Sequence, residues 1–81
     1  MAEEVDYMKL KFTYHARSQA LARFINESRI AYTIRNYDTS GPAAAGSTFY
    51  RKKFEDGILE VICRKTDNNK NEHLVLTAYF L

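Results

Sequence analysis

The sequence predicts a small α+β domain with two layers, in which two helices pack on one side of a mainly antiparallel sheet in the order β-α-α-β-β-β. Apolar residues alternate with polar ones at 7–14 and recur in strand-like runs through most of 48–80. Between these stretches, residues 15–37 carry apolar side chains at helical spacing. The 81 residues suit a single domain, 1–81, with a small core that a homodimer would help to stabilise.

The first predicted strand spans residues 7–14 and has one apolar face. That face carries Met8, Leu10, Phe12 and Tyr14, and the opposite face carries Lys9, Lys11, Thr13 and His15. Thr13 is a suitable N-cap for the helix that follows, because its hydroxyl can accept a hydrogen bond from a free amide of the first turn. The acidic residues 1–6 before the strand are expected to be flexible.

Two helices follow, at about 15–25 and 28–37. The first is expected to bury a stripe consisting of Ala20, Leu21, Phe24 and Ile25. The second begins after a cap at Asn26 or Ser28 and is expected to bury Ile30, Ile34 and Tyr37. Residues 31–34 are β-branched or aromatic for the most part, so an extended segment is the alternative there.

The remainder of the chain is predicted to be β-structure after a mobile loop at 38–47, which holds two glycines and the only proline. Strands at 48–54 and 58–65 flank Asp56-Gly57, a dipeptide typical of a two-residue type I′ turn. A polar turn at 67–71 leads to a last strand at about 73–80. That strand is apolar on both faces, which indicates a central place in the sheet.

Composition narrows the functional classes. The formal net charge is +2, and the acidic residues near the N-terminus leave the rest of the chain more basic. Such a surface is compatible with RNA as a partner, although an ordinary solvated surface is the alternative.

Cys63 is the only cysteine and lies in an apolar strand, so we expect a small core residue. No secretory signal or membrane span is visible, no spacing indicates a metal site, and we expect a cytoplasmic protein without a cofactor or membrane contact.

His15 is the strongest candidate for chemistry. It shares the polar strand face with Lys9 and Lys11 and stands at a helix N-terminus, where the helix dipole and nearby cations disfavour the charged imidazolium. A neutral imidazole is what a general base requires. A capping or merely solvent-exposed histidine is the alternative.

Several cations complete the candidate site. Arginine can hold a phosphate with two parallel hydrogen bonds and can stabilise the charge that develops during phosphodiester cleavage. In the run at 50–54, strand alternation places Arg51 and Lys53 on one face and Lys52 on the other, so the two sets cannot join one site. A solvated edge strand protected by lysines is the alternative. Tyr79 shares a face of the last strand with Thr77 and can present a hydroxyl.

A family resemblance rests on the His15-Ala16 helix start, Arg23, and the final Thr77 and Tyr79. This pattern resembles a family of short, mostly bacterial proteins of unassigned function, which are similar in layout to the RelE-type toxin ribonucleases and their BrnT relatives. Where the family pattern often has an arginine four residues after the histidine, this chain has Gln19.

The resemblance implies a RelE-like fold and a metal-independent endoribonuclease that leaves a 2′,3′-cyclic phosphate. His15 would take the proton of the 2′-hydroxyl, and Arg23 with Arg51 or Lys52 would hold the phosphate. The implied residues are His15, Arg23, Arg51 and Tyr79 for catalysis and Lys9, Lys11, Arg17 and Lys52 for RNA binding, with an antitoxin as a further partner. The alternative is a non-catalytic module that binds RNA or a protein partner, as a phage-type inhibitor or a small adaptor does.

Overall fold

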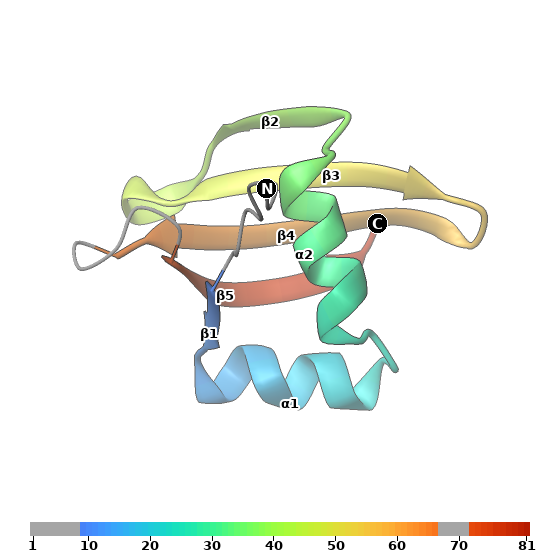
Figure 1. Cartoon of the computed structure of the whole chain (residues 1–81), viewed down its shortest axis with the longest axis horizontal. Helices are drawn as coiled ribbons and strands as arrows, with labels where there is room; N and C mark the ends of the chain where they lie inside the picture. The colour runs from blue at the N-terminus through green and yellow to red at the C-terminus, as the bar shows by residue number, and fades with distance from the viewer. Residues whose placement is uncertain (1–8, 67–71) are drawn as a thin grey trace, which may run out of the picture.

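The computed structural model describes residues 9–66 and 72–81 and shows a two-layer α+β fold (Figure 1). The elements are β1 (Lys9–Phe12), α1 (Tyr14–Ala22), α2 (Glu27–Arg35), β2 (Thr39–Pro42), a 3₁₀ turn (Ala44–Gly46), β3 (Thr48–Phe54), β4 (Gly57–Lys65) and β5 (Glu72–Phe80). The five strands form one sheet in the order β1-β5-β4-β3-β2. Within the described residues only the β1–β5 pair is parallel, so the predicted α+β class and the mainly antiparallel sheet are confirmed.

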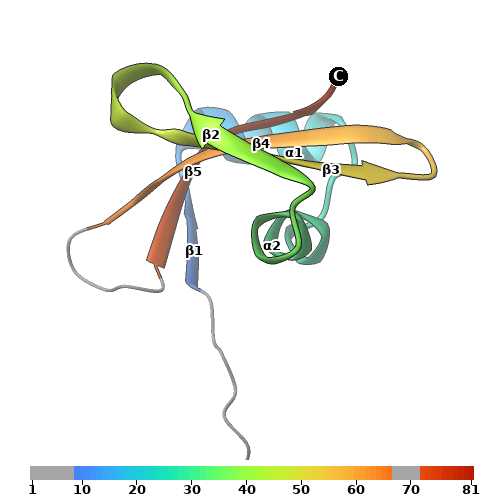
Figure 2. The same cartoon turned by 90° about the horizontal axis from the view of Figure 1, so that it is seen from above.

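The two helices occupy different places on the sheet. Helix α2 packs on one face, against β3 and β4 (Figure 2). Strand β1 pairs only with the first part of β5, and α1 then runs beside the rest of β5 at the sheet edge in the same direction (Figure 1). The junction is fixed by Thr13, whose backbone amide donates to the Val75 carbonyl at 3.1 Å.

The core lies between the sheet, α2 on one of its faces and α1 at its β5 edge. Its fully buried members include Ile30 of α2 and Leu59, Val61 and Cys63 of β4. Cys63 is therefore the core residue that the sequence predicts, and burial raises the pKa of its thiol to about 12. Neither helix among the described residues has the length and apolar composition needed to cross a bilayer.

The N-caps are confirmed, whereas part of the predicted apolar stripe is wrong. Thr13 caps α1 and Asn26, one of the two expected residues, caps α2. The buried residues of α1 are Ala16 and Ala20, while Leu21 and Phe24 are exposed. The helix begins one residue earlier than expected and ends at Ala22, so Phe24 lies beyond the last turn. Leu21 lies about 100° further around the helix than the buried Ala20 and faces solvent.

Two further aromatic residues were also misplaced by the apolar pattern. Tyr14 is the first residue of α1 rather than the end of β1, and it is exposed. Tyr37 lies after α2 and is half exposed, with its ring centroid 5.3 Å from that of Tyr50. Residues 31–34 are helical, so the extended alternative is wrong there.

Two predictions about the loops need correction. The loop expected at 38–47 contains strand β2, which pairs with β3 along Thr39–Pro42, so the sheet has one strand more than predicted. The β3–β4 hairpin turns at Glu55 and Asp56, because Phe54 pairs with Gly57. Neither turn residue has a positive φ, so the turn is not type I′. The positive φ of 139° falls on Gly57 instead. The turn predicted at 67–71 lies outside the described residues, as does Met8.

Candidate functional site

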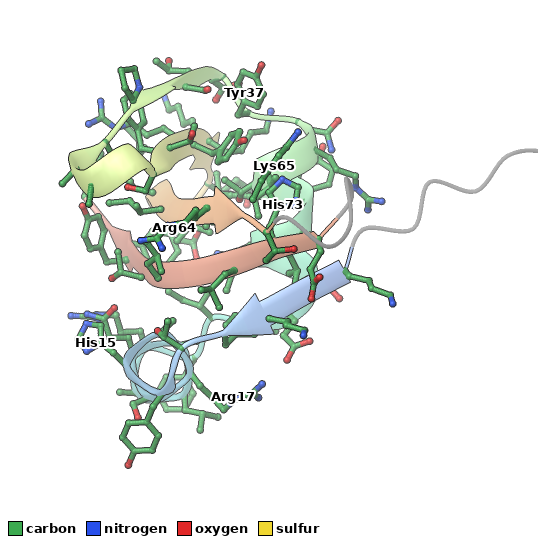
Figure 3. The ribbon with its side chains drawn as sticks, turned by 90° about the vertical axis from the view of Figure 1, so that its left-hand side faces the viewer. His15, Arg17, Tyr37, Arg64, Lys65 and His73 are labelled. Carbon is green, nitrogen blue, oxygen red and sulfur yellow. The ribbon has the colours of Figure 1, made fainter. Side chains whose placement is uncertain are left out.

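The sheet face opposite α2 is the candidate site, and we call it the open face. In the described part of the chain no helix packs across it (Figure 2). Strand register places five cations there against two carboxylates: Lys9, Lys11, Arg51, Lys53 and Arg64 against Glu60 and Glu72. Figure 3 shows Arg64 on this side of the sheet. The excess of positive charge makes the open face suited to a polyanion.

A three-residue hydrogen-bonded group, which we call the Glu60 cluster, lies at the centre of the open face. Glu60 is directly opposite Arg51 on β3 and Tyr79 on β5 in the sheet register. The Nε atom of Arg51 and the hydroxyl of Tyr79 donate to the two carboxylate oxygens of Glu60, one to each. Glu60 is buried, so its carboxylate needs the hydrogen bonds of these two donors in place of hydration.

The Glu60 cluster shifts the titration of both acidic members. Desolvation opposes ionisation of Glu60, but the hydrogen bonds from Tyr79 and Arg51 outweigh it and lower the pKa of the carboxyl group. The hydrogen bond from Tyr79 to Glu60, together with desolvation, raises the pKa of the Tyr79 hydroxyl. At neutral pH the cluster therefore consists of an ionised carboxylate, a protonated phenol and a guanidinium.

Arg51 is held in one orientation with part of its guanidinium available. Its Cζ lies 4.6 Å from the centroid of the Phe49 ring, and that ring covers Gly41, where an added Cβ would come within 3.0 Å of it. Because Glu60 uses only Nε, the terminal nitrogens remain available within the described part of the chain, and the side chain is 42% exposed. An arginine fixed from behind in this way can bind a phosphate with little further ordering.

Helix α1 brings a second row of side chains to the same face. The Thr77 hydroxyl donates to Oε1 of Gln19, which places Gln19 at the edge of the open face. His15 and Arg23 stand four residues before and after Gln19, so the three share one side of the helix. Figure 3 shows His15 on this side and Arg17 on the opposite side, toward α2. The side chains of His15 and Arg23 form no hydrogen bond or ion pair with another described residue.

Because α1 and β5 run in the same direction, their spacings match. Four residues of helix advance about 6 Å and two residues of strand advance about 6.6 Å. Gln19 lies beside Thr77, to which it is hydrogen-bonded. Along the shared direction of α1 and β5, this spacing puts Arg23 beside Tyr79 and His15 beside the first half of β5. Strand register therefore puts Arg51 and Tyr79 on the open face, and helical spacing puts His15 and Arg23 on the side of α1 next to it.

The predicted RNA-binding residues divide between the two sides. Lys9 and Lys11 lie on the open face, with Lys11 Nζ 3.0 Å from a Glu72 oxygen. Lys52 lies on the α2 side of β3 and pairs with Asp38 at 3.2 Å, so it cannot share a site with Arg51. Arg17 also lies on the α2 side, 3.8 Å from Glu27 and with its Cζ 5.2 Å from the Phe12 ring centroid.

Two residues of this site, Glu60 and Gln19, are absent from the candidates that the sequence suggests. Glu60 is a charged residue in the middle of an apolar strand, which is the signal that points to it. Its partner Arg51 follows only from the hairpin register, and a turn at Asp56-Gly57 would have placed Lys53 opposite Glu60 instead. Gln19 has no signal in the sequence by itself, because its importance comes from the contact with Thr77.

The comparisons with known proteins identify no relative, since no family model, no curated protein and no solved structure matches the chain. Among residues 9–66 and 72–81 no three His, Cys, Asp or Glu side chains come together in a way that would hold a metal ion.

Proposed function

We propose that the chain is a small endoribonuclease that binds single-stranded RNA on the open face and cleaves it without a metal ion. The observation that carries the proposal is the oriented Arg51 of the Glu60 cluster on the same face as the row of His15, Gln19 and Arg23. A phosphate bound by both arginines would accept hydrogen bonds from Arg51 of β3 on one side and from Arg23 at the end of α1 on the other. We also propose that the fold has the RelE- and BrnT-like layout that the resemblance implies, and that the protein has an antitoxin as a partner.

The reaction that fits these groups is a transesterification. The His15 imidazole takes the proton of a ribose 2′-hydroxyl, the 2′-oxygen bonds to the adjacent phosphorus, and the bond from phosphorus to the 5′-oxygen breaks. The leaving 5′-oxygen takes a proton from solvent, and the product is a 2′,3′-cyclic phosphate. Arg51 and Arg23 stabilise the added charge on the phosphoryl oxygens. Glu60 is a positioning residue, because it acts through Arg51 and Tyr79.

The test is cleavage of an end-labelled single-stranded RNA in excess EDTA by the purified protein. We expect cyclic phosphate ends, no cleavage of a matched RNA with 2′-deoxy residues, and a loss of about 10²- to 10⁴-fold in rate for His15→Ala. Arg17→Ala is the matched control on the opposite side of α1 and is expected to retain the rate. Failure of the wild-type protein to cleave any RNA, or an equal rate for His15→Ala, would overturn the nuclease assignment.

A second candidate is a module that binds RNA on the same face without cleaving it. It is favoured by the engagement of Arg51 and Tyr79 with Glu60 and of Gln19 with Thr77, because such contacts suit a fixed binding surface as well as a catalytic one. Its signature is affinity that falls steeply with salt, as phosphate contacts displace counterions, together with intact RNA after prolonged incubation.

A further inference from the structure

Helix α1 ends in a hydrogen-bonding pattern that normally requires glycine. The Ile25 amide donates to the Ala20 carbonyl at 2.9 Å and the Phe24 amide donates to the Leu21 carbonyl at 3.3 Å. These two bonds form a Schellman motif, in which the residue after the cap adopts the left-handed conformation and is most often glycine. Here that residue is Phe24, with a φ of +56°. A bulky side chain at positive φ is unfavourable for the isolated helix end.

The same residue is almost completely exposed. Phe24 is 94% exposed, and it continues an apolar stripe on the outer side of α1 with Tyr14 at 88% and Leu21 at 73%. We call these three residues the α1 patch. A groove with a volume of about 250 Å³ opens beside it, between α1 and the start of α2. Its walls include Phe12, Arg17, Ala20, Leu21, Ile25 and Glu27. A strained and exposed aromatic side chain beside an apolar groove marks an interaction surface.

We propose that the α1 patch is the contact surface of a symmetric homodimer, in which Phe24 of each chain enters the groove of the other. A two-fold contact needs both the inserted group and the receiving groove on one surface, and this surface carries both. The charged residues at the groove are also self-complementary. Arg17 and Glu27 are of opposite sign, and a two-fold axis brings each chain's arginine toward the other's glutamate.

The α1 patch supplies a large part of the area that a dimer needs. Exposed aromatic side chains bury roughly 150–250 Å² each, so the α1 patch supplies roughly half of the 800 Å² that a standard interface takes from each partner. The groove walls supply more. The contact leaves the open face accessible, because His15 and Arg17 lie on opposite sides of α1 (Figure 3). The inference is therefore independent of the proposed nuclease.

The experiment is sedimentation equilibrium of the full chain over about 5 to 500 µM, where a dimer dissociates by mass action. We expect a wild-type protein that shifts from 9.4 kDa toward twice that mass as its concentration rises. Phe24→Gly removes the inserted ring while it supplies the residue that the helix end prefers. It should weaken dimerisation at least tenfold, and at low concentration its unfolding midpoint in urea should equal or exceed that of the wild type.

A charge-exchange series separates self-association from general stickiness. Arg17→Glu and Glu27→Arg should each weaken the dimer, and the double variant should restore it, because both contacts across the axis are then reformed with the signs reversed. Tyr32→Ala, at an exposed aromatic of α2 outside the patch, should leave the dimer constant unchanged. A wild-type protein that remains monomeric throughout, or a dimer that Phe24→Gly leaves intact, would overturn the proposal.

Discussion

At the residue scale, the structure depends most on Glu60, a buried carboxylate that two side chains hold in its ionised form. Its lowered pKa is linked to stability. The stabilising pairing is fully present above the carboxyl group's ordinary pKa of 4.5 and is lost as the pH falls through the lower pKa of the folded protein.

Glu60→Gln is therefore expected to reduce the free energy of unfolding by about 1–3 kcal/mol at pH 7 and by much less in acid. Urea unfolding of both proteins at pH 7 and at acidic pH measures this change. Glu55→Gln is the control. Glu55 is an exposed carboxylate in the β3–β4 turn, so its loss should cost under about 0.5 kcal/mol. A Glu60→Gln penalty that stays constant with pH would contradict this account of the cluster.

At the element scale, Thr13 connects β1, α1 and β5. Its hydroxyl accepts from the Ala16 amide at 3.0 Å and lies 3.4 Å from the Leu76 carbonyl, to which it donates. Thr13→Ala should lower the free energy of unfolding by about 1–2 kcal/mol, because the cap of α1 is lost. Thr13→Ser keeps the hydroxyl and should retain most of the stability. Equal urea midpoints for the alanine and serine variants would show that the cap is not what matters here.

The elements were predictable from sequence to the extent that local chemistry determines them. The caps at Thr13 and Asn26 and the buried Ile30 and Ile34 follow from residue type and spacing. Strand β2 was not predictable, because Thr39–Pro42 lacks an apolar pattern and is ordered by pairing with β3. Such a short edge strand depends on a partner that the local sequence does not reveal.

The candidate site was predictable only in part, for the same reason. Strand alternation correctly separates Arg51 from Lys52, because successive side chains point to opposite faces. The pairing of Arg51 and Tyr79 through Glu60 depends on the register of three strands, and moving the hairpin turn by one residue, to Asp56-Gly57, would put Lys53 opposite Glu60 in place of Arg51. Exposure of Leu21 and Phe24 depends on where α1 ends, which the apolar pattern misjudged.

At the scale of the whole molecule, the fold separates two surfaces. The open face is cationic and carries the Glu60 cluster, while the α1 patch is apolar and lies on the outer side of the edge helix. Both arise because α1 lies beside β5 rather than across the sheet (Figure 1). An RNA ligand and a second copy of the chain can therefore bind at the same time under the two proposals.

The most direct test of the proposed RNA-binding face uses two neighbouring residues of β3. Arg51 and Lys52 lie on opposite faces of the sheet. Because both side chains are cationic, substituting either with alanine removes the same formal charge. Binding of a fluorescent single-stranded RNA, measured by anisotropy at fixed low salt, should weaken about tenfold for Arg51→Ala, because an oriented phosphate contact is lost. It should remain within about twofold of the wild type for Lys52→Ala. Equal losses for the two variants, or a larger loss for Lys52→Ala, would contradict the assignment of RNA to the open face.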